Sequence, residues 1–184
     1  MKKHFFLLVG LMAFVFCGCQ SVKSHRVEKK SMEAKKLSSE LRVVTQEEAM
    51  KSIQATYQFL KDAGHYFIAT VDVDQPRVRP FGTVHIFEDK LYIQTGRSKN
   101  VGKQLLKNGK VELCTMKGNE WIRVSGVLVD DPRREAKASM LEEYPNLKSM
   151  YSADDENTMV LYFKPGTGTA TIWSFSADPV EMHF

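Results

Sequence analysis

Six or seven short runs rich in β-branched and aromatic residues recur from residue 66 onward, and turn-forming residues separate them. Runs of this length and composition predict β-strands. Because the connections are local, the pattern favours an antiparallel β-barrel with flanking helices over a doubly wound parallel sheet. No G-x-G-x-x-G motif follows a strand, so a Rossmann nucleotide site is not expected. The expected strands are Tyr66–Val73, Arg77–Glu88, Leu91–Thr95, Val111–Lys117, Trp121–Val129, Met159–Lys164 and Thr169–Phe175.

Helical patterns occur before and between these strands. Thr45-Gln46-Glu47-Glu48 is a capping box, and apolar residues then repeat at helical spacing, so the first helix is expected to cover the core. A second helix carries apolar residues at helical spacing after Ser98, and a third begins at a proline and is highly charged. The expected helices run from Thr45 to Gly64, from Ser98 to Asn108 and from Pro132 to Tyr144, with a short helical or turn segment at Pro145–Tyr151.

Cations gather around the second strand. If Arg77–Glu88 is one extended run, its side chains alternate, so Arg77, Arg79, Phe81, Thr83 and His85 share a polar, cationic face. The opposite face, with Val78, Val84 and Ile86, is expected to join the core. Together with Lys99, these arginines are predicted to converge near a helix N-terminus, whose free N–H groups suit a phosphate. The alternative is a solvated basic hairpin in which Ser98 is a simple N-cap.

Residues 1–19 are expected to be a lipoprotein-type signal peptide. Two lysines precede an apolar run from Phe5 to Phe16, which is too short to span a bilayer comfortably. The run ends at Gly18-Cys19, which resembles the lipobox of bacterial lipoproteins and makes Cys19 the expected lipidated N-terminus. The expected location is therefore the cell envelope, as a membrane-anchored lipoprotein on the periplasmic or surface face. The alternatives are cleavage without lipid and an uncleaved N-terminal anchor.

Residues 20–44 are expected to form a flexible basic tether, because they hold seven Lys or Arg against three Glu. The chain carries +4 in all, of which the signal peptide contributes +2 and the tether +4, so residues 45–184 carry −2. These remaining residues have the size of one domain. Since the basic charge lies outside that domain, we expect no nucleic-acid partner. The lysines of the tether either lie against anionic lipid headgroups or are simply solvated.

Few residues of the domain indicate metal or hydrolytic chemistry. The five histidines show no paired spacing and no adjacent carboxylate set, so no metal site is expected. No Ser-His-Asp or Cys-His motif is present, and no catalytic residue can be assigned. Cys114 is the only cysteine of residues 45–184, which excludes a disulfide within the domain, and it is expected to be a half-buried strand residue.

Several weak motifs occur in a recognisable order. RVRPFG is followed by LYIQTGRSKNVGKQLLKNGKVEL and then by WIRVSGVL. This order resembles the flavin-binding split-barrel family related to pyridoxamine 5′-phosphate oxidase. The tail, LKSMYSADDENTMVLYF followed by TATIWSFS, resembles the smaller single-domain members, so the resemblance spans Leu60–Phe184. It implies a split-barrel fold and a homodimer that binds FMN in clefts at its interface.

The resemblance also implies which positions contact FMN. Arg77 or Arg79 would lie towards the phosphate, and Ser98 and Lys99 would hold it at the start of a helix. Residues from three later strands would approach the ring or the ribityl chain. The implied cofactor contacts are Arg77, Val78, Arg79, Pro80, Phe81, Gly82, Gln94, Thr95, Ser98, Lys99, Trp121, Arg123 and Trp173.

Two departures from the oxidase bear on the activity. Gly82 stands where the oxidase usually has a lysine, and residues 178–184 contain no arginine where the oxidase has an Arg-x-His segment that reads its substrate. We therefore expect an FMN-dependent oxidoreductase that acts on another small molecule, and not pyridoxamine 5′-phosphate oxidase activity. The alternatives are a non-catalytic flavin or haem binding module on the cell envelope, and a barrel that has lost its cofactor.

Overall fold

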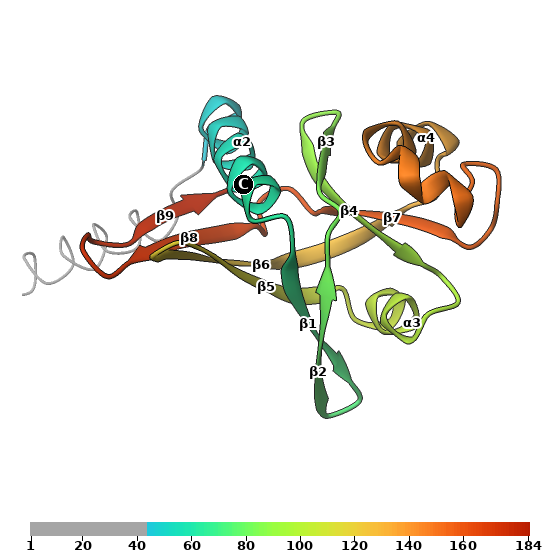
Figure 1. The fold of residues 1–184 in the computed structure, drawn as a ribbon, viewed down its shortest axis with the longest axis horizontal. Helices are drawn as coiled ribbons and strands as arrows, with labels where there is room; N and C mark the ends of the chain where they lie inside the picture. The colour runs from blue at the N-terminus through green and yellow to red at the C-terminus, as the bar shows by residue number, and fades with distance from the viewer. Residues whose placement is uncertain (1–43) are drawn as a thin grey trace, which may run out of the picture. The chain divides into compact units, whose positions relative to one another are not determined.

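Strand pairing in this protein is antiparallel throughout and mostly local along the chain (Figure 1). The computed structural model describes residues 44–184, so the predicted signal peptide, Cys19 and nearly all of the predicted tether lie outside the described residues. The elements follow in the order α2 (Gln46–Ala63), β1 (Tyr66–Asp72), β2 (Gln75–Phe81), β3 (His85–Phe87), β4 (Lys90–Gly96), α3 (Asn100–Lys107), β5 (Lys110–Lys117), β6 (Glu120–Asp131), α4 (Arg134–Glu143), the 3-10 helix η1 (Pro145–Ser149), β7 (Thr158–Phe163), β8 (Thr169–Ser174) and β9 (Val180–His183).

The long strand β6 joins two antiparallel sheets. Its first half, Glu120–Ser125, pairs with β8, and its last residues, Leu128–Asp131, pair with β7. The first sheet therefore has the order β2-β1-β5-β6-β8-β9, and the second has the order β6-β7-β4-β3. This arrangement confirms the predicted antiparallel barrel with flanking helices, with nine strands among the described residues.

Helix α2 closes the main core, as the sequence predicts. The capping box forms as expected, because the Thr45 hydroxyl accepts from the Glu48 N–H and the Glu48 carboxylate accepts from the Thr45 N–H. Helix α2 then buries Ile53, Phe59 and Leu60 against the inner faces of both sheets. A smaller core lies between α4 and the second sheet, around Tyr92, Ala136, Met140 and Val160. Among residues 44–184, no helix combines the length and the apolarity that crossing a bilayer requires.

The prediction of one strand over Arg77–Glu88 is wrong. The chain leaves the first sheet after Phe81 and enters the second at His85, so β2 and β3 belong to different sheets. Val84 is buried in the main core as expected, but Val78 is 65% exposed. The reason is that β2 is an edge strand whose Val78 faces away from the core, while Arg79 faces helix α3. Figure 1 shows β1 and β2 projecting as a hairpin.

Strand β9 is absent from the sequence-based prediction. Residues 180–184 alternate apolar and polar side chains, as a strand does, but the stretch is too short and too close to Pro179 to predict a strand on its own. In the structure β9 pairs with β8, and the buried ring of Phe184 packs edge-on against Phe163 at a centroid distance of 5.7 Å. Gly168 makes room for this ring, because a Cβ atom there would lie 2.3 Å from it. The C-terminal residue is thus part of the core.

Candidate functional site

The first sheet presents its two faces to different surroundings, and this divides the predicted cofactor contacts. Arg79 lies opposite Ile68 of β1, which lies opposite the buried Leu113 of β5, so Arg79 is on the inner-face row. Pro80 lies opposite Phe67, which lies opposite Cys114, which lies opposite Arg123. That row faces away from the core. We call it the outer face, and its members include Phe67, Val78, Pro80, Cys114, Met116, Trp121, Arg123, Thr171 and Trp173.

On the inner-face side, Arg79 is held by neutral groups. One of its terminal nitrogens donates to the Thr70 hydroxyl at 2.6 Å, and the other donates to Gln104 Oε1 of α3 at 2.8 Å. The same Gln104 oxygen accepts from Thr70 at 2.7 Å, so the three side chains form a closed set. Thr70 and Gln104 are both buried. This network fixes the orientation of the half-buried guanidinium beside α3.

Arg79 also differs from the other arginines in charge compensation. Each of the other arginines of residues 44–184 has a carboxylate within 3.5 Å, namely Asp72, Asp130, Glu112, Glu88 or Asp154. Arg79 forms no ion pair with any described residue. Burial, and then the nearby charge of Arg77, lowers the pKa of Arg79. A fixed, partly desolvated cation without a counter-ion is a ready binding group for an anion.

The start of α3 carries two further predicted contacts. Lys99, rather than Ser98, occupies the N-cap position, and its side chain makes no capping bond, so the N-cap interpretation of Ser98 is wrong. The N–H of Ser98 instead donates to Asn157 Oδ1 at 2.9 Å. Helix α3 lies close to the end of β4, because a Cβ atom at Gly102 would be 2.5 Å from the carbonyl oxygen of Gly96. This close approach requires glycine at position 102.

Lys99 and the bonding partner of Arg79 lie at different points along α3. Arg79 bonds to Gln104, five residues after Lys99, which is about 7 Å further along the helix axis. The Lys99 ammonium lies 5.7 Å from the ring centroid of Tyr151. The predicted convergence therefore holds for β2 and α3 as elements, and no direct contact joins the two cations.

Two predicted contacts on β4 are buried. Gln94 and Thr95 are 5% and 4% exposed. The backbone N–H of Gln94 donates to the Thr83 hydroxyl at 3.0 Å, whereas both polar atoms of its side chain lack a hydrogen-bond partner within residues 44–184. Buried amides without partners are rare and are typical of functional regions. Two further predicted contacts lie at the end of β2 and have no unpartnered polar side chain. Phe81 packs against the buried ring of Tyr66, and a Cβ atom at Gly82 would make only ordinary contacts.

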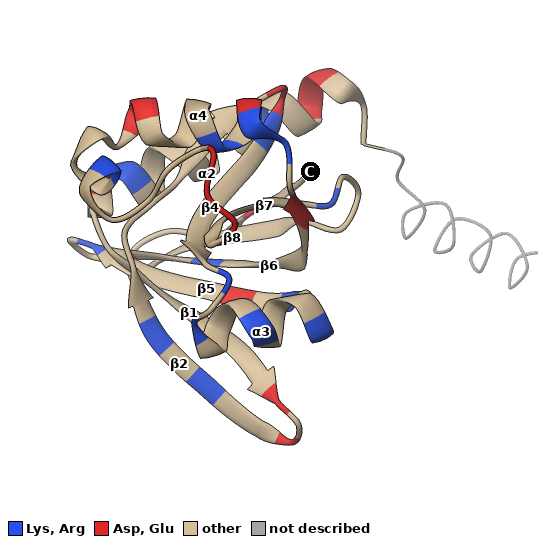
Figure 2. Ribbon diagram, turned by 90° about the vertical axis from the view of Figure 1, so that its right-hand side faces the viewer, with Lys and Arg blue, Asp and Glu red and all other residues tan. Residues whose placement is uncertain are grey.

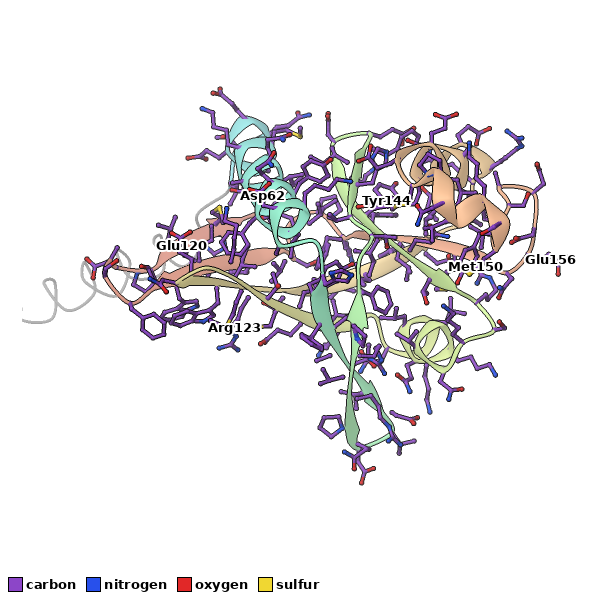
Figure 3. All side chains as sticks on the ribbon, in the orientation of Figure 1. Asp62, Glu120, Arg123, Tyr144, Met150 and Glu156 are labelled. Atoms are coloured by element: carbon purple, nitrogen blue, oxygen red, sulfur yellow. The ribbon has the colours of Figure 1, made fainter. Side chains whose placement is uncertain are left out.

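The outer face carries an aromatic pocket. The rings of Trp121 and Trp173 are stacked, with centroids 6.1 Å apart and planes 7° from parallel, and Phe175 lies against Trp121. Beside them is an open pocket of about 190 Å³. Arg123 Nε donates to Glu112 Oε1 at 2.7 Å within it, and Figure 3 shows Arg123 on the side of β5 and β6 away from α2. The pocket is lined by Glu112, Arg123, Ser125, Thr169, Thr171 and Trp173.

Sequence reasoning missed most of this lining. Trp121, Arg123 and Trp173 were expected, and the structure brings them together. Glu112 and the hydroxyl residues were not expected, although they alternate onto the same face of predicted strands. Had the pairing of β5 with β6 and of β6 with β8 been known from the sequence, it would have placed these residues beside Arg123. The indole N–H of Trp173 is buried and lacks a hydrogen-bond partner among the described residues.

The cationic group of β2 and the aromatic pocket lie apart on one chain. Strands β1 and β5 separate β2 from β6, and three inter-strand spacings amount to about 14 Å. In addition, Arg79 belongs to the inner-face row while Trp121 and Arg123 belong to the outer face. Apart from the buried residues of β4, the predicted contacts therefore fall into two groups, which we call half-sites, one near α3 and one on the outer face.

The remaining titratable candidates have structural partners. His85 Nε2 lies 2.7 Å from the Ser139 hydroxyl, and burial chiefly lowers the pKa of His85. Cys114 is a strand residue of β5 as expected, but it is exposed on the outer face rather than half-buried, and desolvation by its neighbours raises the pKa of the thiol. In the part of the chain that the structure describes, no three His, Cys, Asp or Glu residues gather as metal ligands.

Comparison with known proteins identifies relatives of this fold. The family model described as pyridoxamine 5′-phosphate oxidase matches residues 53–173. A NimC/NimA family protein from Clostridium acetobutylicum is 41% identical, with a TM-score of 0.72, and the match covers 74% of this chain and 95% of that one. No curated protein matches the chain.

Two more distant structures share the fold alone. General stress protein 26 from Bacillus anthracis is 17% identical with a TM-score of 0.52, and the match covers 72% of this chain and 98% of that one. A heme binding protein from Mycobacterium smegmatis is 11% identical with a TM-score of 0.53, and the match covers 76% of this chain and 58% of that one.

Proposed function

The chain belongs to the pyridoxamine 5′-phosphate oxidase family, and from this premise we propose that it binds FMN and acts as an oxidoreductase on a small molecule. The observation that carries the proposal is the uncompensated charge of Arg79. Its guanidinium is oriented by Thr70 and Gln104, and it has no carboxylate partner among the described residues. A phosphate supplies the missing anion and accepts directed hydrogen bonds from a guanidinium.

The surroundings of Arg79 fit the phosphate end of FMN. Arg77 lies two residues away on the same face of β2 and is half exposed, with only a long 3.5 Å contact to Asp72. Lys99 lies at the start of α3, where a helix N-terminus favours negative charge. We propose that Arg77, Arg79, Ser98 and Lys99 serve the phosphate, although Gly82 provides no cation.

The ring of FMN requires an apolar and aromatic wall, and among the described residues the stacked indoles that suit it lie on the outer face, away from Arg79. We propose that a second copy provides it, so that the partner's Trp121 and the partner's Trp173 face the β2 segment of the first copy. A two-fold symmetric dimer would then contain two complete sites, each built from one half-site of each copy. The exposed apolar residues of the outer face support a partner there, because Phe67 is 55%, Val78 65% and Met116 60% exposed.

Bound FMN supplies the electron and hydride transfer. In the proposed site, the cations of one chain would hold the phosphate, and its strand β2 would lie along the cofactor. The aromatic residues of the partner would shield one side of the cofactor from water. Glu112 is tied to Arg123 and His85 to Ser139, so we assign neither of them as a proton donor. Residues 178–184 contain no arginine that could bind a phosphorylated substrate. This segment pairs with β8, and its His183 lies 2.9 Å from Glu181.

We expect the purified protein to be yellow, with the absorption spectrum of a flavin. NAD(P)H should reduce it, and quinones or nitroaromatics should reoxidise it with multiple turnovers. The alternative is a module that binds flavin or haem without catalysis, and it would show a bound chromophore and no turnover. A haem spectrum, or colourless protein whose melting temperature does not rise with FMN, would contradict the proposal.

We also propose that the protein is anchored to the cell envelope through lipidated Cys19. The support is the sequence alone, since this residue lies outside the described part of the chain. A Cys19→Ser variant should move from the membrane fraction to the soluble fraction, while a Cys17→Ser variant should stay with the membrane. Retention of Cys19→Ser in the membrane would contradict lipidation at this residue and would favour an uncleaved anchor.

A further inference from the structure

One stretch of the folded domain contains cations and no acidic residue. Between Asp89 and Glu112 the chain carries Lys90, Arg97, Lys99, Lys103, Lys107 and Lys110 without a single Asp or Glu. The domain as a whole carries −2, so this stretch opposes the sign of the rest. Such segregation of charge creates a local positive field on a domain with a negative balance.

Helix α3 collects most of these cations on one surface. It buries Val101, Gly102, Gln104 and Leu105, and it leaves Lys103, Leu106 and Lys107 exposed. Lys99 and Lys110 flank this exposed side at the two ends. We call these five exposed residues, Lys99, Lys103, Leu106, Lys107 and Lys110, the α3 strip. Figure 2 shows the basic positions of α3 and of β2 in the same region, and the Arg79–Gln104 bond joins the two elements.

The lysines of the α3 strip are not neutralised. None of the four forms an ion pair with a carboxylate among residues 44–184, whereas Lys51, Lys61 and Lys117 elsewhere do. Neighbouring lysines four residues apart repel one another in an isolated helix. Because no carboxylate among the described residues compensates this repulsion, an anionic partner that covers the surface lowers its electrostatic free energy.

The form of the α3 strip selects among anionic partners. Long, exposed lysines without partners do not preorganise a site for one small ligand, but they adapt to an extended anionic surface. Leu106 is 50% exposed among them, and a bilayer interface accepts an apolar side chain together with basic ones. A nucleic acid backbone offers only charge to the strip and no apolar region for Leu106, so it matches the strip less well than a bilayer interface does. The +4 tether is repelled by the strip itself.

We propose that the α3 strip docks the folded domain on the anionic headgroups of a lipid bilayer. The apolar run of residues 5–16 and the basic tether that follows it already place the chain near a membrane by sequence. Docking through α3 then sets which side of the domain faces the lipid. Lys99 also belongs to the proposed phosphate site, so the test of docking uses Lys103 and Lys107, which lie on the exposed side of α3 and not on the side that bonds to Arg79.

The test uses residues 44–184 alone, so that the N-terminal region cannot dominate. This unit has its own core, and the Clostridium acetobutylicum relative, 95% of which the match covers, shows that a chain of about this extent folds. Flotation should recover the domain with vesicles of phosphatidylcholine containing about one third phosphatidylglycerol, and not with pure phosphatidylcholine. High salt should release it, because exposed charges are screened.

Paired substitutions locate the binding surface. The Lys103→Gln/Lys107→Gln variant should bind anionic vesicles roughly 30-fold more weakly, about 5-fold for each lysine. The Lys148→Gln/Lys164→Gln variant changes the net charge equally, at exposed lysines outside the strip, and should bind as the wild type does. Equal losses in the two variants, no recovery with anionic vesicles, or displacement from them by equimolar duplex DNA would overturn the proposal.

Discussion

An Arg79→Gln variant is expected to bind FMN about 100-fold more weakly than the wild type, because a charge-assisted bond to the phosphate contributes up to about 3 kcal/mol. Glutamine keeps a polar group beside Thr70 and Gln104 but removes the positive charge. The loss should therefore appear in ligand affinity more than in folding. Flavin fluorescence quenching, titrated with apo-protein, measures the dissociation constants.

Riboflavin provides the matched ligand, since it has the ring and the ribityl chain but no phosphate. The wild type should prefer FMN over riboflavin, and Arg79→Gln should lose most of that preference while its affinity for riboflavin changes little. An Arg134→Gln variant removes an arginine from an exposed ion pair with Asp154 and should leave both affinities unchanged. If Arg79→Gln weakened both ligands equally, or neither, the phosphate would not be bound at this guanidinium.

Local patterns predicted most of the fold. Strands β1, β5 and β6 were found within two residues at either end, because each has a buried row that alternates with an exposed one. The capping box fixed the start of α2 correctly, since both of its hydrogen bonds are made within four consecutive residues. These elements are determined by near neighbours in the sequence, which is the information that a single sequence contains.

The misses concern contacts between distant residues. Val78 looks like a core residue, but it lies on the outer face of the first sheet, where Phe67 of the interior strand β1 is exposed as well. Strand β9 depends on pairing with β8 and on the burial of Phe184, and its own four residues alternate apolar and polar side chains over too short a stretch to indicate either. The partners of Arg79 illustrate the same limit, since Thr70 and Gln104 are 34 residues apart in the chain. The resemblance identified the arginine, and only the structure shows what orients it.

The shared site in the proposed dimer predicts that two defective chains can restore each other. One chain carries Arg79→Gln and lacks the phosphate group of contacts, and the other carries Trp121→Leu and lacks part of the aromatic wall. Each variant alone should retain little FMN. When the two are co-expressed with different tags and the mixed dimer is isolated, one of its two sites combines both intact halves, so about half of the wild-type flavin content should return.

The control for this experiment places both substitutions in one chain and pairs it with wild-type chain. Every site in that mixed dimer then contains one defect, so little flavin should be retained, although the same four halves are present. The difference between the two mixed dimers depends only on which halves meet, and stability effects of the substitutions cancel between them. The reverse result, with half of the flavin retained in this control and little in the first mixed dimer, would mean that each chain builds its site alone, and the separation of about 14 Å between β2 and β6 would then have to close within one chain.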